Sequence, residues 1–116
     1  MALTKVTPQN TEPEVLAPIS DRPSYGTRTV AYSNVANTAI GILDENLVRK
    51  NFIVVNDTNQ DLYIKFLTAT NNTVSTVDWS IKIPPGLFYE PQTYVTPAAI
   101  AAIGGGTGTI RVTEQN

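Results

Sequence analysis

The sequence of 116 residues contains no cysteine and no histidine. Without cysteine the chain forms no disulfide and offers no thiolate to a metal ion, and this absence neither requires nor forbids secretion. Histidine is the commonest general base in enzymes and the commonest ligand of transition metals, so its absence removes both roles. We therefore expect a protein that is not an enzyme and that has no cofactor and no metal site.

Charge and long apolar runs are also scarce. Eight lysine and arginine residues stand against ten aspartate and glutamate residues, and they form no blocks. Proteins that bind nucleic acids usually carry a basic stripe, so no nucleic-acid partner is expected. No segment approaches the roughly 20 apolar residues of a membrane-spanning helix. Residues 1–5 are followed by polar residues and prolines, so no signal peptide and no membrane partner are predicted.

Residues 1–26 differ from the rest of the chain because proline recurs in them at every fifth position. Proline removes backbone donors, so neither a helix nor a central strand fits this segment. The segment also keeps aliphatic residues and little charge, whereas disordered tails usually have the opposite composition. We predict an extended N-terminal arm that becomes ordered on a partner, with a disordered tail as the alternative. Its partner-binding residues would be Leu3, Val6, Pro8, Pro13, Val15, Leu16, Pro18, Ile19 and Pro23.

Residues 27–116 have the pattern of a single domain of short strands. Phe52–Val55 is an unbroken and mostly β-branched run, typical of a central strand that is covered on both faces. Asp61–Phe66 alternates between apolar and polar residues, as a half-exposed strand does. The polar residues 56–60 between them favour a turn, so we expect the two strands to pair as a β-hairpin.

Further strands are predicted at residues 27–32, 39–43, 77–83, 87–90 and 109–114, with a bulge at Gly41 and a type II turn at Pro85-Gly86. Thr96–Ile103 predicts a short helix, because Thr96 suits the N-cap and Pro97 the first helical position. Together these elements predict an all-β domain, which is a β-sandwich or jelly-roll-like barrel with one short helix. Whether Phe52 and Val54 or Ile53 and Val55 face the core stays open. The predicted core is Phe52, Val54, Leu62, Ile64, Phe66, Trp79, Ile81, Ile110 and Val112.

Three local patterns suggest a ligand, and each has a simpler explanation. Asp57, Asn59 and Asp61 have the spacing that opens a calcium loop, but that loop needs a glycine at position 62 and a glutamate at position 68, so a turn explains them better. The glycines of residues 104–108 lack the lysine of a phosphate-binding loop and predict a flexible connection. The aromatic residues Tyr63, Trp79, Tyr89 and Tyr94 suit either a sugar-stacking platform or a core and an interface.

Several strings of the sequence carry a family resemblance. They are Asn46-x-x-Arg49-x-x-Phe52-Ile-Val-Val-Asn56, Asp61-Leu-Tyr-Ile-Lys65, Ile83-Pro-Pro-Gly86 with Tyr89-Glu90, the segment 98–103, and Gly108-Thr-Ile-Arg-Val-Thr-Glu114. In this order they resemble small structural proteins of the head and neck of tailed bacteriophages, over about residues 46–114. The resemblance implies a β-sandwich that serves as a building block of a virion, commonly as a symmetric oligomer, with no catalytic residue.

The resemblance and the composition together lead to a functional expectation. We expect a capsid decoration (cement) protein that bridges shell subunits through its β domain and its arm. It would be made in the host cytoplasm and sit on the capsid surface. Its partners would be the major capsid protein or other virion subunits, and copies of itself in a dimer or trimer. A neck or tail component of the virion and a carbohydrate-binding adhesion module are the alternatives.

Overall fold

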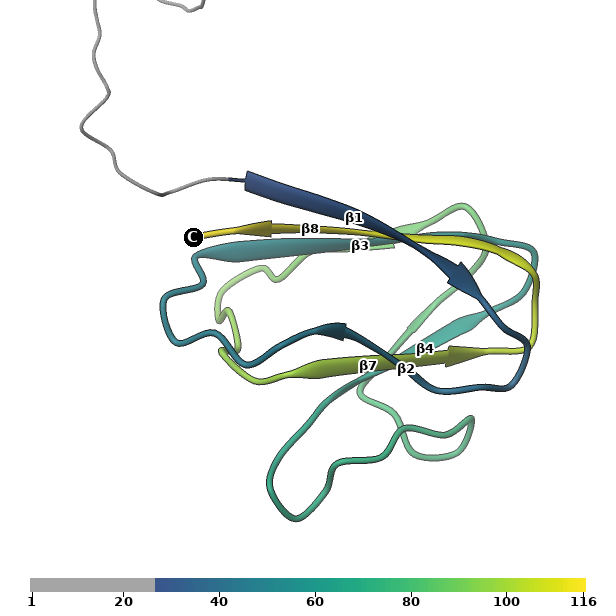
Figure 1. Cartoon of the computed structure of the whole chain (residues 1–116), viewed down its shortest axis with the longest axis horizontal. Coiled ribbons are helices and arrows are strands. Elements are labelled where there is room, and N and C mark those ends of the chain that lie inside the picture. The colour runs from purple at the N-terminus through teal and green to yellow at the C-terminus, as the bar shows by residue number, and fades with distance from the viewer. Residues whose placement is uncertain (1–26) are drawn as a thin grey trace, which may run out of the picture.

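The computed structural model describes residues 27–116, which form two four-stranded antiparallel β-sheets packed face to face (Figure 1). One sheet contains, in order, β1 (Thr27–Asn34), β8 (Gly108–Gln115), β3 (Asn51–Thr58) and β6 (Phe88–Tyr89). The other contains, in order, β2 (Ile40–Leu43), β7 (Ile100–Gly104), β4 (Leu62–Phe66) and β5 (Ile81–Ile83). The all-β sandwich predicted from the sequence is confirmed, but the sheets do not close into a barrel. The predicted arm, with its nine partner-binding residues, lies outside the described residues.

The connections between strands mostly cross from one sheet to the other. Of the seven connections, only that from β4 to β5 joins neighbours in one sheet. The predicted hairpin of Phe52–Val55 with Asp61–Phe66 is therefore wrong, because β3 and β4 belong to different sheets. Strand β3 pairs with β8 up to Thr58, and the chain then crosses the core to begin β4 at Leu62. The polar turn residues are real, but they form an arch between the layers.

Asn56 is the residue that fixes this arch. Its side chain is fully buried, and its amide nitrogen donates to the carbonyl oxygens of Gln60 at 2.8 Å and Ile83 at 2.7 Å. Its side-chain oxygen accepts from the backbone N–H of Thr58 at 2.9 Å. A buried amide with all its partners satisfied stabilises one backbone path strongly, because any other path would leave those groups unpaired. Asn56 thus holds the end of β3 against both the β3–β4 arch and the end of β5.

The glycine-rich connection between β7 and β8 packs against the same arch. Gly108 has a φ of 130°, and a side chain there would place its Cβ 2.6 Å from the carbonyl oxygen of Asp57. The backbone N–H of Asn59 donates to the carbonyl oxygen of Thr107, and the side-chain oxygen of Asn59 accepts from the backbone N–H of Thr107. Residues 104–108 are therefore a tightly packed corner and not the flexible connection that we predicted.

The core lies between the two sheets. Phe52 and Val54 face it, which decides the ambiguity of that strand, whereas Ile53 and Val55 lie on the outer face and are only half-buried. The rings of Phe66 and Tyr89 pack against the Phe52 ring from the edge of the core. Of the predicted core residues, all but Trp79 are buried or packed against it. The buried core residues are Ile42, Leu43, Phe52, Val54, Leu62, Ile64, Ile83, Ile100, Ala102, Ile110 and Val112.

The helix predicted at residues 96–103 is absent, and Ile100–Gly104 is instead the buried strand β7. The capping bond does form, because the Thr96 hydroxyl accepts from the backbone N–H of Ala98 at 3.2 Å. A helix would next use the carbonyl oxygens of Thr96 and Ala98, but both accept hydrogen bonds from Arg49. Pairing with β2 on one side and β4 on the other then fixes the alanine-rich segment as a strand despite its helical propensity.

The strand predicted at residues 77–83 is also shorter than expected. Ser75 and Asp78 exchange backbone hydrogen bonds in a tight turn, and the strand begins only at Ile81. Trp79 therefore lies outside the core with 41% of its surface exposed. By contrast, the turn after β5 is as predicted, because Gly86 has a φ of 79° and the Leu87 N–H donates to the Pro84 carbonyl oxygen. The predicted bulge at Gly41 is confirmed by the register shift between Gly41 and Leu43.

Candidate functional site

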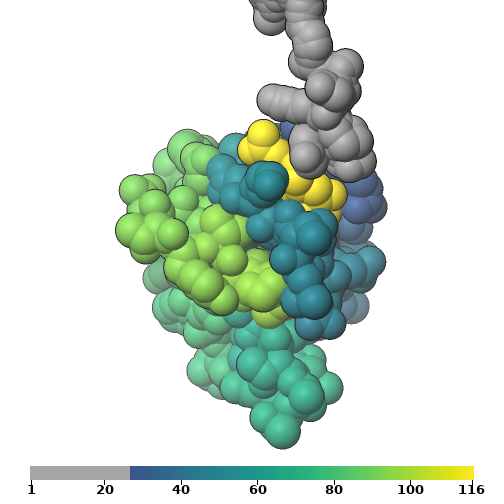
Figure 2. Space-filling model, turned by 90° about the vertical axis from the view of Figure 1, so that its left-hand side faces the viewer, coloured from purple at the N-terminus to yellow at the C-terminus, as the bar shows by residue number. Residues whose placement is uncertain are grey.

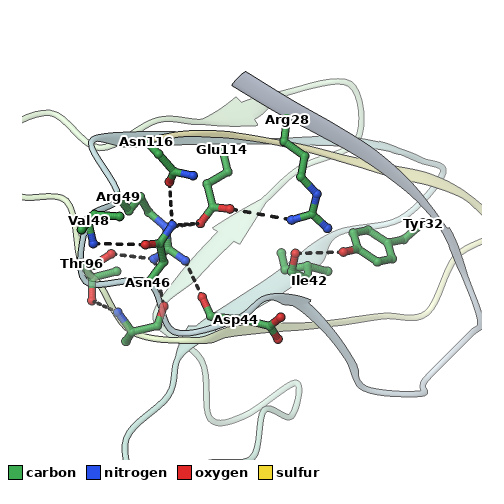
Figure 3. Close-up of polar contacts among 11 residues, drawn as sticks. Arg28, Tyr32, Ile42, Asp44, Asn46, Val48, Arg49, Thr96, Glu114 and Asn116 are labelled. Atoms are coloured by element: carbon green, nitrogen blue, oxygen red, sulfur yellow. Dashed lines mark hydrogen bonds and ion pairs between the residues drawn. The ribbon is translucent and has the colours of Figure 1, made fainter. Parts of the chain in front are cut away.

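One end of the sandwich is closed by a buried polar network around Arg49 (Figure 3). The Arg49 side chain is fully buried, and its Nε donates to Glu114 Oε2 at 2.9 Å. Its Nη1 donates to the carbonyl oxygens of Thr96 at 2.7 Å and Ala98 at 3.0 Å, and its Nη2 donates to that of Asp44 at 2.7 Å. These are four of the five N–H groups of a guanidinium, so the cation is held in one orientation.

Asn46 completes this network from the same loop. Its side-chain nitrogen donates to Glu114 Oε2 at 3.0 Å and to Asn116 Oδ1 at 2.6 Å. Its side-chain oxygen accepts from the backbone N–H of Val48 at 3.1 Å, and its own backbone N–H donates to the Pro97 carbonyl oxygen at 2.8 Å. Asn46 thereby fixes the turn that leads to Arg49 and joins it to the C-terminal residues.

The network binds together three segments that are far apart in the sequence. They are the loop of residues 44–50, the loop of residues 90–99 and the end of β8, and Figure 2 views the molecule from this end. A buried ion pair whose remaining donors and acceptors are satisfied holds its elements in one arrangement, and removing one partner is costly. The guanidinium carbon also lies 5.6 Å from the centroid of the Phe52 ring, so the network rests directly on the core.

The network holds two exposed apolar side chains at the surface. Leu47 is 78% and Val48 is 68% exposed, and both lie between Asn46 and Arg49 in the fixed turn. We call this pair the apolar tip. Because both residues flanking the tip are held by the network, the tip has a supported backbone and not a loose one. Such a surface can bind an apolar partner with little loss of conformational entropy.

Only two of the four aromatic residues proposed for sugar stacking lie together. The rings of Tyr63 and Trp79 are 5.5 Å apart and tilted by 48°. Trp79 belongs to the loop of residues 67–80, which Lys65 holds at two points: its Nζ donates to Asn71 Oδ1 at 2.5 Å and to Asp78 Oδ2 at 2.6 Å. Tyr89 is instead packed against the core, and Tyr94 lies exposed in the loop of residues 90–99. The four side chains form no common platform.

Two of the three residues of the calcium-like pattern, Asp57 and Asn59, have protein partners. Asp57 Oδ2 accepts from Arg111 Nε at 3.1 Å on the surface, and the side-chain oxygen of Asn59 accepts from the backbone of Thr107. Residues 27–116 contain no group of three or more acidic side chains placed to hold a metal ion. Among the same residues, no helix is long and apolar enough to cross a membrane.

A shallow depression of about 260 Å³ lies on the outer face of the sheet formed by β1, β8, β3 and β6. The side chains of Asn51 and Glu90, which are joined by a hydrogen bond of 2.7 Å, lie at its border. Sites for small molecules usually enclose roughly 300–1,000 Å³, so this depression is smaller and more open than such a site.

The buried network was not predicted from the sequence, although it contains residues of the family resemblance. Asn46 and Arg49 were singled out there by spacing and Glu114 by its place in the closing string. The sequence feature that indicates such a network is an arginine beside a strongly apolar run, because a cation next to a core strand needs a buried partner.

Comparison of the chain with models of protein families, with curated proteins and with solved structures finds no match.

Proposed function

We propose that this chain is a structural protein of a tailed-bacteriophage virion, most specifically a decoration protein that cements the shell. The proposal rests on the family resemblance, and the structural observation that supports a contact with another protein is the apolar tip of Leu47 and Val48, held in place by a buried ionic network. Two exposed apolar side chains on a fixed backbone can contact another protein with little loss of conformational entropy. In a virion, the contacted protein would be the major capsid protein or another virion subunit.

Three residues of the strings that carry the family resemblance meet in the structure. Asn46, Arg49 and Glu114 belong to two strings at opposite ends of the resembling region, and they meet in one network. The two unspecified positions between Asn46 and Arg49 are those of the apolar tip. In the proposal, the specified residues hold a frame, and the two unspecified residues between them contact the partner.

The charge of the chain favours a place on the outside of the capsid. A net charge of −2 without a basic patch suits the outer surface better than contact with packaged genome. In this proposal the protein is made in the host cytoplasm, assembles as a homo-oligomer and uses residues 1–26 as an additional tether. A neck or tail component of the same virion is the nearest alternative, with the same kind of contact at a different place.

Binding of the purified protein to particles that lack it tests the proposal. We expect saturable binding by the full chain, and binding at least about tenfold weaker for Leu47→Asp and Val48→Asp, because a charge in an apolar contact is costly. Val77→Asp is the matched control, since Val77 is 89% exposed in a different loop. Deletion of residues 1–24 should also greatly weaken binding. Absence of binding, or equal binding by all point variants, would refute the proposed contact.

A carbohydrate-binding adhesion module is the second candidate, and the exposed indole of Trp79 beside Tyr63 is the observation in its favour. One exposed indole can stack on one sugar ring, whereas a tilted neighbour adds little stacking area. Binding to immobilised glycans, with Trp79→Ala as the control, tests it. No binding at millimolar sugar would exclude this function.

A further inference from the structure

The two sheets have four edge strands, and three of them are protected against pairing with another chain. Strand β6 has two residues and is soon followed by Pro91, and β5 has three residues and is followed directly by Pro84. Strand β2 has four residues and a bulge near Gly41. Short length, proline and bulges are the means by which natural sheets prevent edge-to-edge association.

Strand β1 has none of these protections. It pairs with β8 without interruption over eight residues, from Thr27 opposite Gln115 to Asn34 opposite Gly108. It contains no proline and no bulge, and Arg28 is its only charged residue. Within residues 27–116 no strand pairs with its other side, and Figure 1 shows it at the margin of its sheet nearest the viewer. A long, regular and nearly uncharged edge offers a row of backbone donors and acceptors to another strand.

We propose that the partner of this edge is β1 of a second copy of the chain, paired antiparallel across a two-fold axis. In such a pair the outer faces of the two sheets lie on the same side of the joined sheet. Each residue must therefore lie opposite a residue whose side chain points to the same face. Registers centred on Val30 or Ala31 satisfy this rule. Val30 and Tyr32 are half-buried in one copy and lie on the inner side of the sheet. In the register centred on Ala31, Val30 lies opposite Tyr32 of the second copy, and in the register centred on Val30 the two Val30 residues lie opposite each other. The pairing would increase the burial of this apolar surface and join the two sheets into one of eight strands.

The charges of β1 permit this self-association. In the register centred on Val30, Arg28 lies opposite Tyr32 of the second copy, and in the register centred on Ala31 it lies opposite Asn34. The two arginines therefore lie at opposite ends of the pair, and no like charges are opposed. The Arg28 guanidinium also has a carboxylate nearby in its own copy, with Glu114 Oε1 at 3.9 Å from Nη1.

A single strand pair buries little surface. We therefore expect the interface to bury less than about 1,200 Å² in total, as weak and transient complexes do. In an assembly that holds several copies, the high effective concentration would strengthen it. The inference does not depend on what the apolar tip binds, because β1 and the tip lie in different parts of the sequence and are altered by different substitutions.

Sedimentation velocity of the full chain from micromolar to near-millimolar concentration tests the proposal. We expect a monomer–dimer equilibrium that Ala31→Glu and Ala31→Lys each weaken by about fivefold or more. Like charges then lie directly opposite each other in the register centred on Ala31, and they are diagonal neighbours in the register centred on Val30. Ala31 is exposed, so both variants should fold. An equimolar mixture of the two variants should restore dimers, since opposite charges then face each other.

Lys82→Gln is the matched control. It lowers the net charge of the chain by one unit, as Ala31→Glu does, but on the edge strand β5. It should leave the equilibrium unchanged. A chain that stays monomeric throughout, an association that both Ala31 variants leave intact, or a mixture that does not recover would each overturn the proposal. The second of these outcomes would assign the association to a different surface.

Discussion

Substitution of Arg49 by methionine should greatly destabilise the domain. Methionine keeps much of the side-chain volume and removes the charge, so the buried carboxylate of Glu114 loses its closest cation, and three backbone carbonyl oxygens lose their donor. Glu114 would keep only the amide of Asn46 and the distant guanidinium of Arg28. Removing one partner of a buried ion pair costs about 3–5 kcal/mol. A domain of this size is stable by about 5–15 kcal/mol, so the loss is a large part of the total.

Urea denaturation followed by far-ultraviolet circular dichroism measures this loss. We expect a midpoint shift that corresponds to at least 3 kcal/mol, or a fall of the melting temperature by at least about 12 °C. Arg28→Met is the control, because Arg28 contacts the same carboxylate at 3.9 Å from a side chain that is 68% exposed. Exposed ion pairs contribute about 0–1 kcal/mol. If Arg49→Met costs as little as Arg28→Met, the network does not hold this end of the sandwich.

Three further predictions concern Asn56 in the arch between β3 and β4, Gly108 in the corner between β7 and β8, and the aromatic residues Trp79 and Phe52. Asn56→Ala should cost at least about 2 kcal/mol in urea denaturation, because it removes the side-chain partners of the Ile83 carbonyl oxygen and of the Thr58 backbone N–H. The Gln60 carbonyl oxygen would keep the Thr58 hydroxyl as a donor. A cost below about 0.5 kcal/mol would contradict the role of Asn56. Gly108→Ala should lower the melting temperature clearly, because its φ of 130° and the nearby Asp57 carbonyl oxygen oppose a side chain, whereas Gly41→Ala, with no atom within 4 Å of its Cβ, should have little effect. Trp79→Ala should cost less than about 1 kcal/mol, because the indole is exposed, whereas Phe52→Ala should cost about 3–5 kcal/mol, because Phe52 is buried. Equal losses of stability in thermal denaturation would contradict the assigned core.

The positions of most strands could be predicted from the sequence, but their pairing could not. The alternation in Leu62–Phe66 and in the last strand identifies which side chains face inward, because a strand alternates wherever it lies. A polar turn of five residues serves a hairpin and an arch equally well. The choice depends on β7 and β8, which follow some forty residues later and pair with β4 and β3 in different layers.

The missed helix shows the same limitation at a smaller scale. Thr96 and Pro97 favour a helix start by interactions that are local in the sequence, and one of these interactions is present. The carbonyl oxygens that a helix would use are taken by an arginine 47 and 49 positions away. No pattern within residues 96–103 contains that information.

The candidate site was predictable only in part, for a related reason. The spacing of Asn46 and Arg49 singled out both residues, but their burial and their common partner Glu114 depend on a contact between chain segments more than sixty positions apart. Trp79 was assigned to the core by alternation alone, and the Ser75–Asp78 turn interrupts the strand that would have placed it there.

Cryo-electron microscopy of the virion tests the proposal that this chain decorates the outside of the capsid. We predict density for the sandwich at many symmetric positions on the outer capsid surface, with the apolar tip of Leu47 and Val48 against a shell subunit. A single ring of density at the portal vertex would assign the protein to the neck. Density nowhere on the purified particle would contradict a structural role in the virion.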